Sequence, residues 1–338
     1  MKKVTIRQIA EHLNLSIAAV SRALDGYSDI SVETRQRVLE AAQEMGYVPN
    51  RAARQLRRQK TDAIGYILPA GTPGFSEAFF SEFLVGLGDE TPRHRLDLLI
   101  STAGSSLERE KELYRDWVRS QKVDGFILNR IRLSDWRVRY LHENQIPFVA
   151  MENSLDGIDY PYVEVDNTGG VAALVEHIHR QGFRRLAFIG GPHDLKIQVA
   201  RLAGYRQGLA HCGLGFDPDL VVESELSAAG GYQEARRLRW LPNPPDALIC
   251  MNDEIAFGAL HAMHDLSLDV GREVAVAGFD GVSASAHTRP PLTTLDIPIH
   301  QIAQTLVQAL AFRLANKPVQ QICLALTPRL LLRASTGA

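Results

Sequence analysis

The sequence predicts two kinds of fold in one chain: a small all-α helix-turn-helix head and an α/β body made of two doubly wound parallel sheets. Three short amphipathic helical patterns within the first 46 residues indicate the head. From residue 63 onward, short apolar runs alternate with helix-length amphipathic segments, which is typical of parallel sheets. At roughly 150 residues per domain, 338 residues leave room for about two domains.

Charge divides the chain at the same place. Residues 1–60 hold eleven Lys and Arg against six Asp and Glu, a formal charge of +5, whereas the remainder holds 26 against 33, a charge of −7. The overall charge of −2 therefore hides a basic head on an acidic body. This asymmetry indicates two separate functions.

Cysteine usage and hydropathy narrow the class of protein. The cysteines have no CxxC spacing, so we expect neither a disulfide framework nor a zinc site, and a reducing cytoplasm is favoured; they are Cys212, Cys250 and Cys323. No signal-like apolar segment opens the chain, and no run of 18 apolar residues occurs in it. We expect a protein that is neither exported nor inserted in a membrane.

The first helix is predicted from about residue 6 to residue 13. Thr5 and Gln8 have the spacing of a capping box. One face repeats at helical spacing and comprises Ile6, Ile9, Ala10 and Leu13. Asn14 suits a left-handed exit, and Ser16 can cap a second helix that runs to Leu24. Two short helices joined by a three-residue turn form a helix-turn-helix candidate.

A third helix is predicted to begin after Ser31 and to end at Gly46, with Glu33 favourable in its first turn. Its inward side chains are Val38, Leu39, Ala42 and Met45. Three such helices are enough for a minimal compact core.

The second helix has two different faces. The inward face comprises Val20, Ala23 and Leu24, and the other comprises Ile17, Ala18, Ser21 and Arg22. An exposed Arg22 can contact guanine in the major groove, while Ile17 and Ala18 offer apolar surface to a thymine methyl group. Ser16 and Ser21 suit phosphate oxygens. The alternative is a compact helical module in which Arg22 is only a solvated charge.

Residues 47–60 (YVPNRAARQLRRQK) add to the basic character of the head. Asn50 can cap a short helix with Ala52, Ala53 and Leu56 on its apolar face, surrounded by arginines that include Arg54. Such a helix is marginal alone and could order on DNA, with Leu56 as a wedge in the minor groove. The alternative is a basic flexible linker.

The predicted strands of the body are short apolar runs at residues 63–68, 96–101, 124–128, 147–151, 185–190, 246–251 and 274–279. Because one sheet does not comfortably take residues 63–338, we expect two subdomains with a cleft between them. Ligands of such sheets bind beyond the carboxyl ends of the strands.

Residues that follow these strand ends are the candidate ligand site. They are Phe79, Phe80, Asn129, Arg130, Glu152, Arg201, Asn252, Asp253 and Asp280. Carboxylates, an amide and a guanidinium beside aromatic rings suit the hydroxyls of a sugar, which need both donors and acceptors. As alternatives, Asn252 and Asp253 could simply cap the following helix, and Glu152 could be a solvated loop acid.

Many ordered motifs along nearly the whole chain resemble the LacI/GalR family of bacterial transcription regulators, of lactose-repressor type. They begin with VTIRQIAEHLNLSIAAVSRALDG and continue with AIGYILP, VDGFIL, VDN, RRLAFIGGP, RLAGYRQGL, VAGFDG, PPLTTL and LLLRAST. The resemblance implies a periplasmic-binding-protein-like body whose chain crosses between subdomains near Val163, Pro291 and Gln321. The implied domains are a DNA-binding head at 1–48, a hinge helix and linker at 49–62, and an effector and dimerisation domain at 63–338. Within the effector and dimerisation domain, the implied N-subdomain comprises about 63–162 with 292–321. The implied C-subdomain comprises about 163–291 with 322–338.

The same resemblance assigns roles to residues. It implies that Ile17, Ala18 and Arg22 read bases and that Leu56 opens the operator centre; Ala19 stands where Thr is common, so a phosphate contact is missing there. The full set expected at DNA is Thr5, Ser16, Ile17, Ala18, Ser21, Arg22, Asn50, Ala53, Arg54 and Leu56. In the cleft, Arg201 and Asp280 are the strongest candidates. Leu226 replaces a frequent aromatic residue, which weakens sugar stacking.

The predicted function is that of a cytoplasmic, sequence-specific transcriptional regulator, a repressor located at the bacterial nucleoid through its operator. We expect a homodimer on an inverted-repeat operator, because palindromic DNA mirrors two-fold protein symmetry. A dimer is favoured over a tail-assembled tetramer, because no heptad tail is present. A neutral mono- or disaccharide is favoured as effector, and Arg130 with Arg132 leaves an anionic sugar open.

Other classes of function are not favoured by the sequence. A solute-binding protein would not explain the basic head, and no nucleotide-binding or hydrolase motif indicates an enzyme or a cofactor. His261 and His264 lie one turn apart but lack metal-ligand spacing. Trp136 and Trp240 are expected to pack against neighbouring helices.

Overall fold

The computed structural model describes residues 4–25, 27, 29–47, 60–71, 78–317 and 323–337. The chain forms two units, Met1–Lys60 and Thr61–Ala338. The predicted hinge residues Asn50, Ala53, Arg54 and Leu56 lie outside the described residues. Within the described part, no helix is both long and apolar enough to cross a membrane.

The head contains the three predicted helices, α1 (Ile6–Leu13), α2 (Ile17–Leu24) and α3 (Val32–Glu44). The Thr5 backbone N–H donates to Gln8 Oε1 at 2.8 Å, and Ser16 Oγ accepts from the Ala19 N–H at 3.1 Å. Asn14 has a φ of 53°, which confirms the left-handed exit from α1. The buried core comprises Ile9, Ala10, Val20, Ala23, Val38, Ala41 and Ala42.

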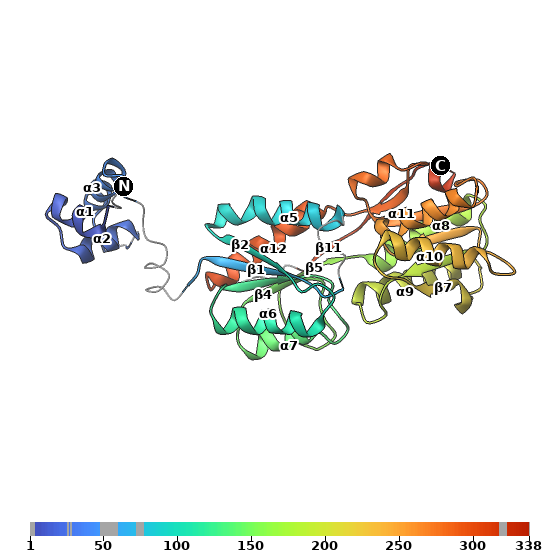
Figure 1. The fold of residues 1–338 in the computed structure, drawn as a ribbon, viewed down its shortest axis with the longest axis horizontal. Helices are drawn as coiled ribbons and strands as arrows, with labels where there is room; N and C mark the ends of the chain where they lie inside the picture. The colour runs from blue at the N-terminus through green and yellow to red at the C-terminus, as the bar shows by residue number, and fades with distance from the viewer. Residues whose placement is uncertain are drawn as a thin grey trace. The chain divides into compact units, whose positions relative to one another are not determined.

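The first sheet of the body is entirely parallel, in the order β11-β5-β4-β3-β1-β2. Its strands are β1 (Ala63–Leu68), β2 (Asp97–Thr102), β3 (Gly125–Leu128), β4 (Phe148–Met151), β5 (Tyr162–Val165) and β11 (Cys323–Leu326). Helices α5 (Ala78–Glu90) and α12 (Ile299–Leu314) cover one face, and α6 (Leu107–Arg119) and α7 (Trp136–Glu143) cover the other (Figure 1). Because helices cover both faces, β1, β3 and β4 are buried along their whole length.

The second sheet has the order β12-β10-β9-β8-β6-β7 and is parallel except for β12. Its strands are β6 (Leu186–Gly190), β7 (Val221–Glu223), β8 (Ala247–Cys250), β9 (Ala275–Asp280), β10 (Thr293–Asp296) and β12 (Arg329–Leu331). The covering helices are α8 (Asn167–Arg180), α9 (Lys196–His211), α10 (Ala228–Arg239) and α11 (Asp253–Asp265). A Cβ atom at Gly258 would collide with the backbone of Ala228, so glycine allows α10 and α11 to pack closely.

The chain passes between the sheets three times. It leaves the first sheet after β5, returns after β10 through α12 to β11, and ends in the second sheet with β12. The expected crossings near Pro291 and Gln321 differ from this, because β10 belongs to the second sheet and β11 to the first. The sequence did not indicate these short strands, so the crossings were placed before them.

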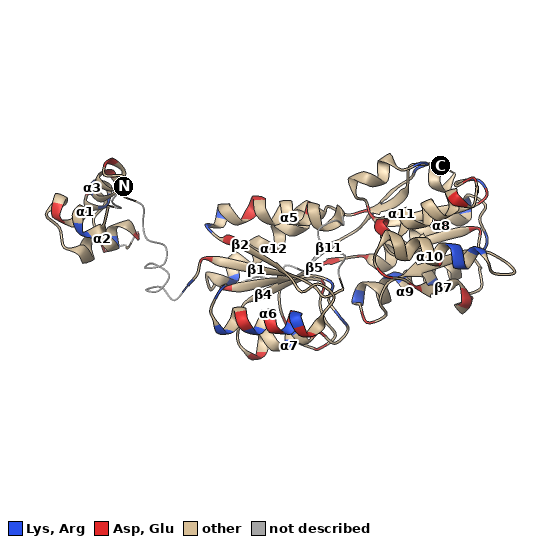
Figure 2. Cartoon of the chain, in the orientation of Figure 1, with Lys and Arg blue, Asp and Glu red and all other residues tan. Residues whose placement is uncertain are grey.

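Many charged side chains of the body lie on its outer helices (Figure 2). Figure 2 shows both signs of charge along α6. Ion pairs at i,i+3 spacing on this helix include Lys111 with Glu108 and Arg119 with Asp116. Such pairs keep the outer face of α6 solvated and leave the inner face free to pack on the sheet.

Candidate functional site

A pocket lies between the two sheets of the body, where side chains from both subdomains meet. It has a volume of about 50 Å³. Its lining comprises Phe79, Asn129, Arg130, Met151, Glu152, Ile197, Arg201, Leu226, Met251, Asn252 and Asp280. We call this the cleft pocket. Seven of the nine candidate effector residues therefore lie together in space.

The parallel strands bring these residues to one place. Asn129 follows β3, Glu152 follows β4 and Asp280 ends β9, so all three stand at carboxyl ends of strands. Arg130, Glu152 and Asp280 have φ values of 49°, 78° and 111°. Residues other than glycine rarely adopt this backbone region, and such positions concentrate at ligand sites.

Arg201 lies on the first turns of α9 and is buried. Its Nε donates to Asn167 Oδ1 at 2.8 Å, its Nη2 lies 3.6 Å from Asp280 Oδ1, and it also donates to the Met251 carbonyl. The guanidinium carbon lies 3.5 Å from the centre of the Phe279 ring. Burial lowers the pKa of Arg201, while the charge of Asp280 opposes this shift. These contacts fix the guanidinium at the edge of the cleft pocket.

Glu152 and Asn129 present buried polar atoms without partners. Glu152 is 3% exposed and Asn129 is 1% exposed. No hydrogen bond within the described part of the chain reaches either carboxylate oxygen of Glu152 or either amide atom of Asn129. Buried polar groups are normally hydrogen-bonded, so these atoms are suited to a polar ligand or to ordered water. Their burial also removes the alternative that Glu152 is a solvated loop acid.

The surroundings of Glu152 change its protonation. Burial raises the pKa of Glu152 to about 7, although the charges of Arg201 and Lys196 oppose that shift. The carboxyl group can therefore either donate or accept a hydrogen bond near neutral pH.

Phe80 and Asp253 are not among the residues that line the cleft pocket, which corrects the expectation for both. Phe80 is fully buried behind Phe79, and the Arg130 guanidinium lies 4.7 Å from its ring centre. Asp253 accepts from the Val282 N–H at 3.0 Å and from Thr294 Oγ1 at 2.6 Å. Both side chains are directed into the core, where they support the pocket from behind.

Asn252 both caps a helix and lines the cleft pocket. Its Oδ1 accepts from the Ile255 N–H at 2.9 Å and so caps α11. The residue also lines the cleft pocket. Capping and pocket lining are therefore compatible at this residue.

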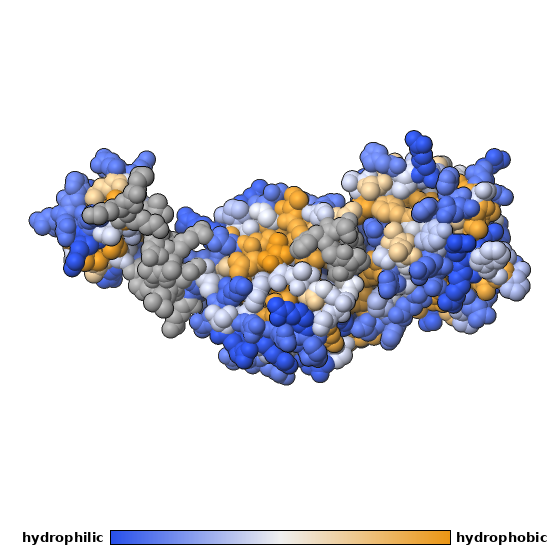
Figure 3. Space-filling view, viewed as in Figure 1, coloured by the Kyte–Doolittle hydropathy of each residue, from blue (hydrophilic) through white to orange (hydrophobic). Residues whose placement is uncertain are grey.

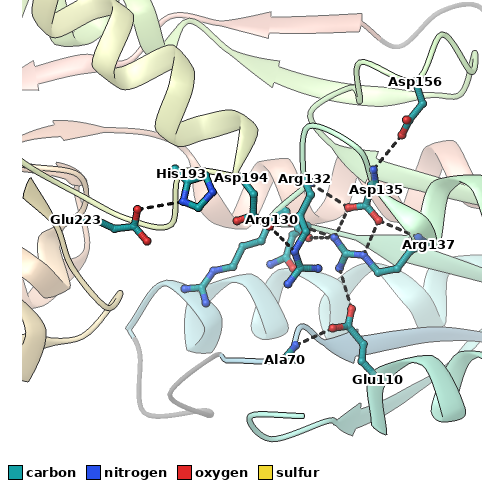
Figure 4. A network of polar contacts seen from close by, with 11 residues as sticks. Ala70, Glu110, Arg130, Arg132, Asp135, Arg137, Asp156, His193, Asp194 and Glu223 are labelled. Atoms are coloured by element: carbon teal, nitrogen blue, oxygen red, sulfur yellow. Dashed lines mark hydrogen bonds and ion pairs between the residues drawn. The ribbon is translucent and has the colours of Figure 1, made fainter. Parts of the chain in front are cut away.

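Beside the cleft pocket, two loops from opposite subdomains are joined directly. The Leu133 N–H donates to the Asp194 carbonyl at 2.8 Å, and the Lys196 N–H donates to the Ile131 carbonyl at 2.9 Å. Arg132 Nε donates to Asp194 Oδ2 at 3.1 Å (Figure 4). We call these contacts the subdomain latch. The latch was not predicted from the sequence, because no pattern in either loop indicates that the two loops contact each other.

A buried ion network holds one side of the latch. Arg137 donates to both carboxylate oxygens of Asp135 and to the carbonyls of Asn129 and Arg130 (Figure 4). Glu110 lies 3.6 Å from the same guanidinium and accepts from the Ala70 N–H at 2.9 Å. Burial opposes ionisation of Asp135, but the charge of Arg137 and the hydrogen bonds from Arg137 and Arg132 together outweigh burial and lower the pKa of that carboxyl. The network fixes the loop that carries Asn129.

On the head, α2 presents the predicted contact face to solvent. Ser16, Ile17, Ala18 and Arg22 are exposed, Thr5 is exposed at the start of α1, and Ser21 is half-buried. Arg22 forms an ion pair with Asp29 and lies 5.5 Å from the Tyr27 ring centre. Neither Tyr27 nor Asp29 was singled out from the sequence.

Three apolar pocket residues were also missed by sequence reasoning: Met151, Ile197 and Met251. Met151 and Met251 adjoin Glu152 and Asn252 directly, so their place next to strand ends was the available signal. Ile197 is half-buried on α9 beside the latch and had no such signal.

Comparisons with known proteins agree with this arrangement. Residues 5–50 match the family described as bacterial regulatory proteins, lacI family, and residues 175–336 match the periplasmic binding protein-like domain. The HTH-type transcriptional regulator AglR of Rhizobium meliloti (strain 1021) is 35% identical, covering 99% of this chain and 94% of that protein.

Solved structures extend the comparison to the whole chain. A lac repressor dimer bound to operator and the anti-inducer ONPF is 26% identical with a TM-score of 0.83, and all of both chains is covered. A complex of the transcriptional regulator CelR with cellobiose is 27% identical with a TM-score of 0.75, covering 98% of this chain and 100% of that one.

Proposed function

We propose, from the premise that this chain belongs to the LacI family of bacterial transcription regulators, that it is a repressor controlled by a sugar. The family is one of DNA-binding regulators and not of enzymes. The repressor role and the sugar are the proposed part. A lac repressor and a CelR–cellobiose complex among similar structures support both.

The observation that carries the sugar proposal is the pair of unpartnered polar side chains in the cleft pocket. Glu152 and Asn129 together offer donors and acceptors from the first subdomain. Arg201 and Asp280 face them from the second subdomain. Sugar hydroxyls need donors and acceptors at once, and Phe79 adds a ring against which the apolar face of a sugar can lie. The sugar would connect the two subdomains.

We propose that residues 1–48 read the operator and that residues 49–62 form the hinge. In the head, Ile17, Ala18 and Arg22 are the base contacts, since they lie on the exposed face of α2. Thr5, Ser16 and Ser21 are assigned to phosphate, and Asn50, Ala53, Arg54 and Leu56 to the hinge contact. This activity places the protein at the nucleoid, in the cytoplasm of a bacterium.

We further propose a homodimer on an inverted-repeat operator. Apolar side chains gather over α5 and β2 on one face of the body (Figure 3). The helices and edge strand of this subdomain carry the exposed apolar side chains Val85 on α5, Ile100 on β2 and Phe312 on α12. Exposed apolar patches of this kind mark protein interfaces, and two-fold symmetry matches a palindromic site.

The proposal is tested by a thermal-shift and calorimetry screen of neutral sugars on the full chain. A ligand that binds only the folded state raises the melting temperature. Asn129→Ala should keep the melting temperature of the ligand-free chain, because its amide makes no hydrogen bond within the described structure. The same variant should weaken sugar binding about tenfold or more, as expected for a lost polar contact. Binding that is unchanged in Asn129→Ala would place the ligand elsewhere.

A further inference from the structure

A second cavity adjoins the cleft pocket. It has a volume of about 250 Å³, and the two cavities share Glu152 and Ile197 in their linings. The remaining residues of the second cavity are Glu164, Val165, Asp166, Asn167, Thr168, Lys196 and Ala200. We call it the crossover chamber, because residues 164–168 are the first crossing of the chain between the sheets.

The sizes of the two cavities bear on the ligand. A cavity of about 150 Å³ accommodates one six-membered ring such as benzene. The cleft pocket, at about 50 Å³, is smaller than this, whereas the crossover chamber, at about 250 Å³, is larger. The crossover chamber therefore has room for a whole ring, whereas a ring that contacts the cleft pocket must extend beyond that pocket into the open part of the cleft.

Glu152 connects the two cavities chemically. It lines both, it is almost completely buried, and neither of its carboxylate oxygens has a hydrogen-bond partner among the described residues. A ligand group placed on either side can reach this carboxyl. Arg201 continues the connection, because it lines the cleft pocket and donates to Asn167, which lines the chamber.

The charges of the crossover chamber favour hydroxyl groups over anions. Its lining contains the carboxyls of Glu152, Glu164 and Asp166 but only one amine, that of Lys196. Lys196 Nζ already lies 3.4 Å from Glu164 Oε1. Carboxylates accept hydrogen bonds from hydroxyls, whereas an anionic group would meet like charge. The anionic sugar left open by Arg130 is therefore disfavoured at this end of the cleft.

We propose that the crossover chamber is a subsite for a second, uncharged sugar unit, so that the effector is at least a disaccharide that extends past Glu152. The inference rests on the proposed function, since it concerns the effector of the same cleft. One unit contacts Asn129, Arg201 and Asp280, and the other contacts Glu164 and the backbone turn at the start of α8.

The test compares mono- and disaccharide binding to the full chain by titration calorimetry. The probes are glucose and galactose, together with the neutral disaccharides cellobiose, maltose, lactose and melibiose. Ala200→Leu places a larger side chain in the chamber on a helix that tolerates leucine, and Ala200 does not line the cleft pocket. Val199→Leu is the matched control, because Val199 is exposed on the same helix and lines neither cavity.

The expected result is selective. The wild-type chain should bind a disaccharide at least tenfold more tightly than either monosaccharide. Ala200→Leu should remove most of this advantage without changing monosaccharide binding, and Val199→Leu should change neither. Glu164→Gln, a substitution at a half-exposed side chain, should weaken the disaccharide alone by about threefold to tenfold.

The outcomes separate this inference from the proposed function. Disaccharide binding that is lost in Asn129→Ala but unchanged in both Ala200→Leu and Glu164→Gln would overturn the subsite and leave the cleft as the effector site. Equal affinity of the wild type for mono- and disaccharides would also overturn the subsite. If no probe bound the wild-type chain, the sugar proposal and the subsite would both be overturned.

Discussion

Arg132 and Asp194 join the two subdomains of the body, because Arg132 follows β3 of the first sheet and Asp194 precedes α9 of the second. The pair is only one residue away from Ile131 and Leu195, and α9 carries the pocket residues Ile197 and Arg201. Any change in the angle between the subdomains must therefore alter the latch and the cleft pocket together. An effector shifts such an equilibrium only by its difference in affinity for the two states.

The latch predicts a modest effect on effector binding. In Arg132→Ala, the conformation seen here loses a contact between the subdomains, so sugar binding should weaken by up to about fivefold, the upper range for a partly exposed ion pair. Arg139→Ala is the control, because Arg139 pairs with Asp156 inside one subdomain. Calorimetry that gave the same loss for both variants would contradict a specific role of the latch.

Glu152 predicts a pH dependence of stability. Its pKa is raised from 4.5 to about 7 in the folded chain. Below pH 4.5 the carboxyl is neutral in both folded and unfolded states, so its favourable contribution is fully present there. This contribution is lost as pH rises through about 7, on the order of 3 kcal/mol in total.

Urea unfolding between about pH 5 and pH 8 measures the free energy of unfolding over the range in which Glu152 ionises differently in the folded and unfolded chain. Glu152→Gln remains neutral, so its free energy of unfolding should fall less over that range than that of the wild type. Parallel curves for the two proteins would show that Glu152 ionises in the folded chain as it does in the unfolded one.

Arg22 predicts a specific effect on DNA binding. Arg22→Ala should cost about 1–3 kcal/mol on the operator and little on random DNA, as expected for a guanine contact. Asp29→Asn should act in the opposite direction by up to about fivefold, because it removes the carboxylate that pairs with Arg22 in the chain without DNA. Fluorescence anisotropy on both DNAs measures this. Equal weakening by Arg22→Ala on both would reduce Arg22 to a phosphate contact.

The apolar surface on α5 predicts a solution dimer. Val85 on α5 is 57% exposed. Val85→Asp would place a charge in the interface and should shift sedimentation toward the monomer, with operator affinity falling in parallel because each protomer reads half a site. Val199→Asp, at a similarly exposed valine outside this surface, should stay dimeric. If the Val85→Asp protein sediments like the wild type, the dimer interface does not include Val85.

Sequence reasoning located the long apolar strands well, because burial on both faces produces continuous runs such as Ala63–Leu68. It missed strands that are short or not continuously apolar, such as Val221–Glu223 and Thr293–Asp296. These segments form strands because they pair with adjacent strands of the sheet. Trp240 was expected to pack and is instead 75% exposed. Indole size predicts burial only where another element is present to cover it.

The candidate site was likewise predicted where the sequence has a local signal and missed where distant segments pack together. Strand ends identified Asn129, Glu152 and Asp280, because topology alone brings them together. The burial of Glu152, the inward direction of Asp253 and the pairing of Arg132 with Asp194 depend on packing between distant segments, so the sequence contained no direct signal for them.

Occupation of the cleft by a sugar should change DNA binding by the same chain. This coupling is measured as the operator affinity of the full chain by fluorescence anisotropy, with and without a saturating sugar, in wild type and Asn129→Ala. The operator is first selected from random DNA with the wild-type protein. We expect the sugar to change wild-type affinity by about fivefold or more, the scale of allosteric coupling, and to leave Asn129→Ala unchanged. A wild-type operator affinity that stays constant while calorimetry shows the cleft to be occupied would mean that the two sites are not coupled.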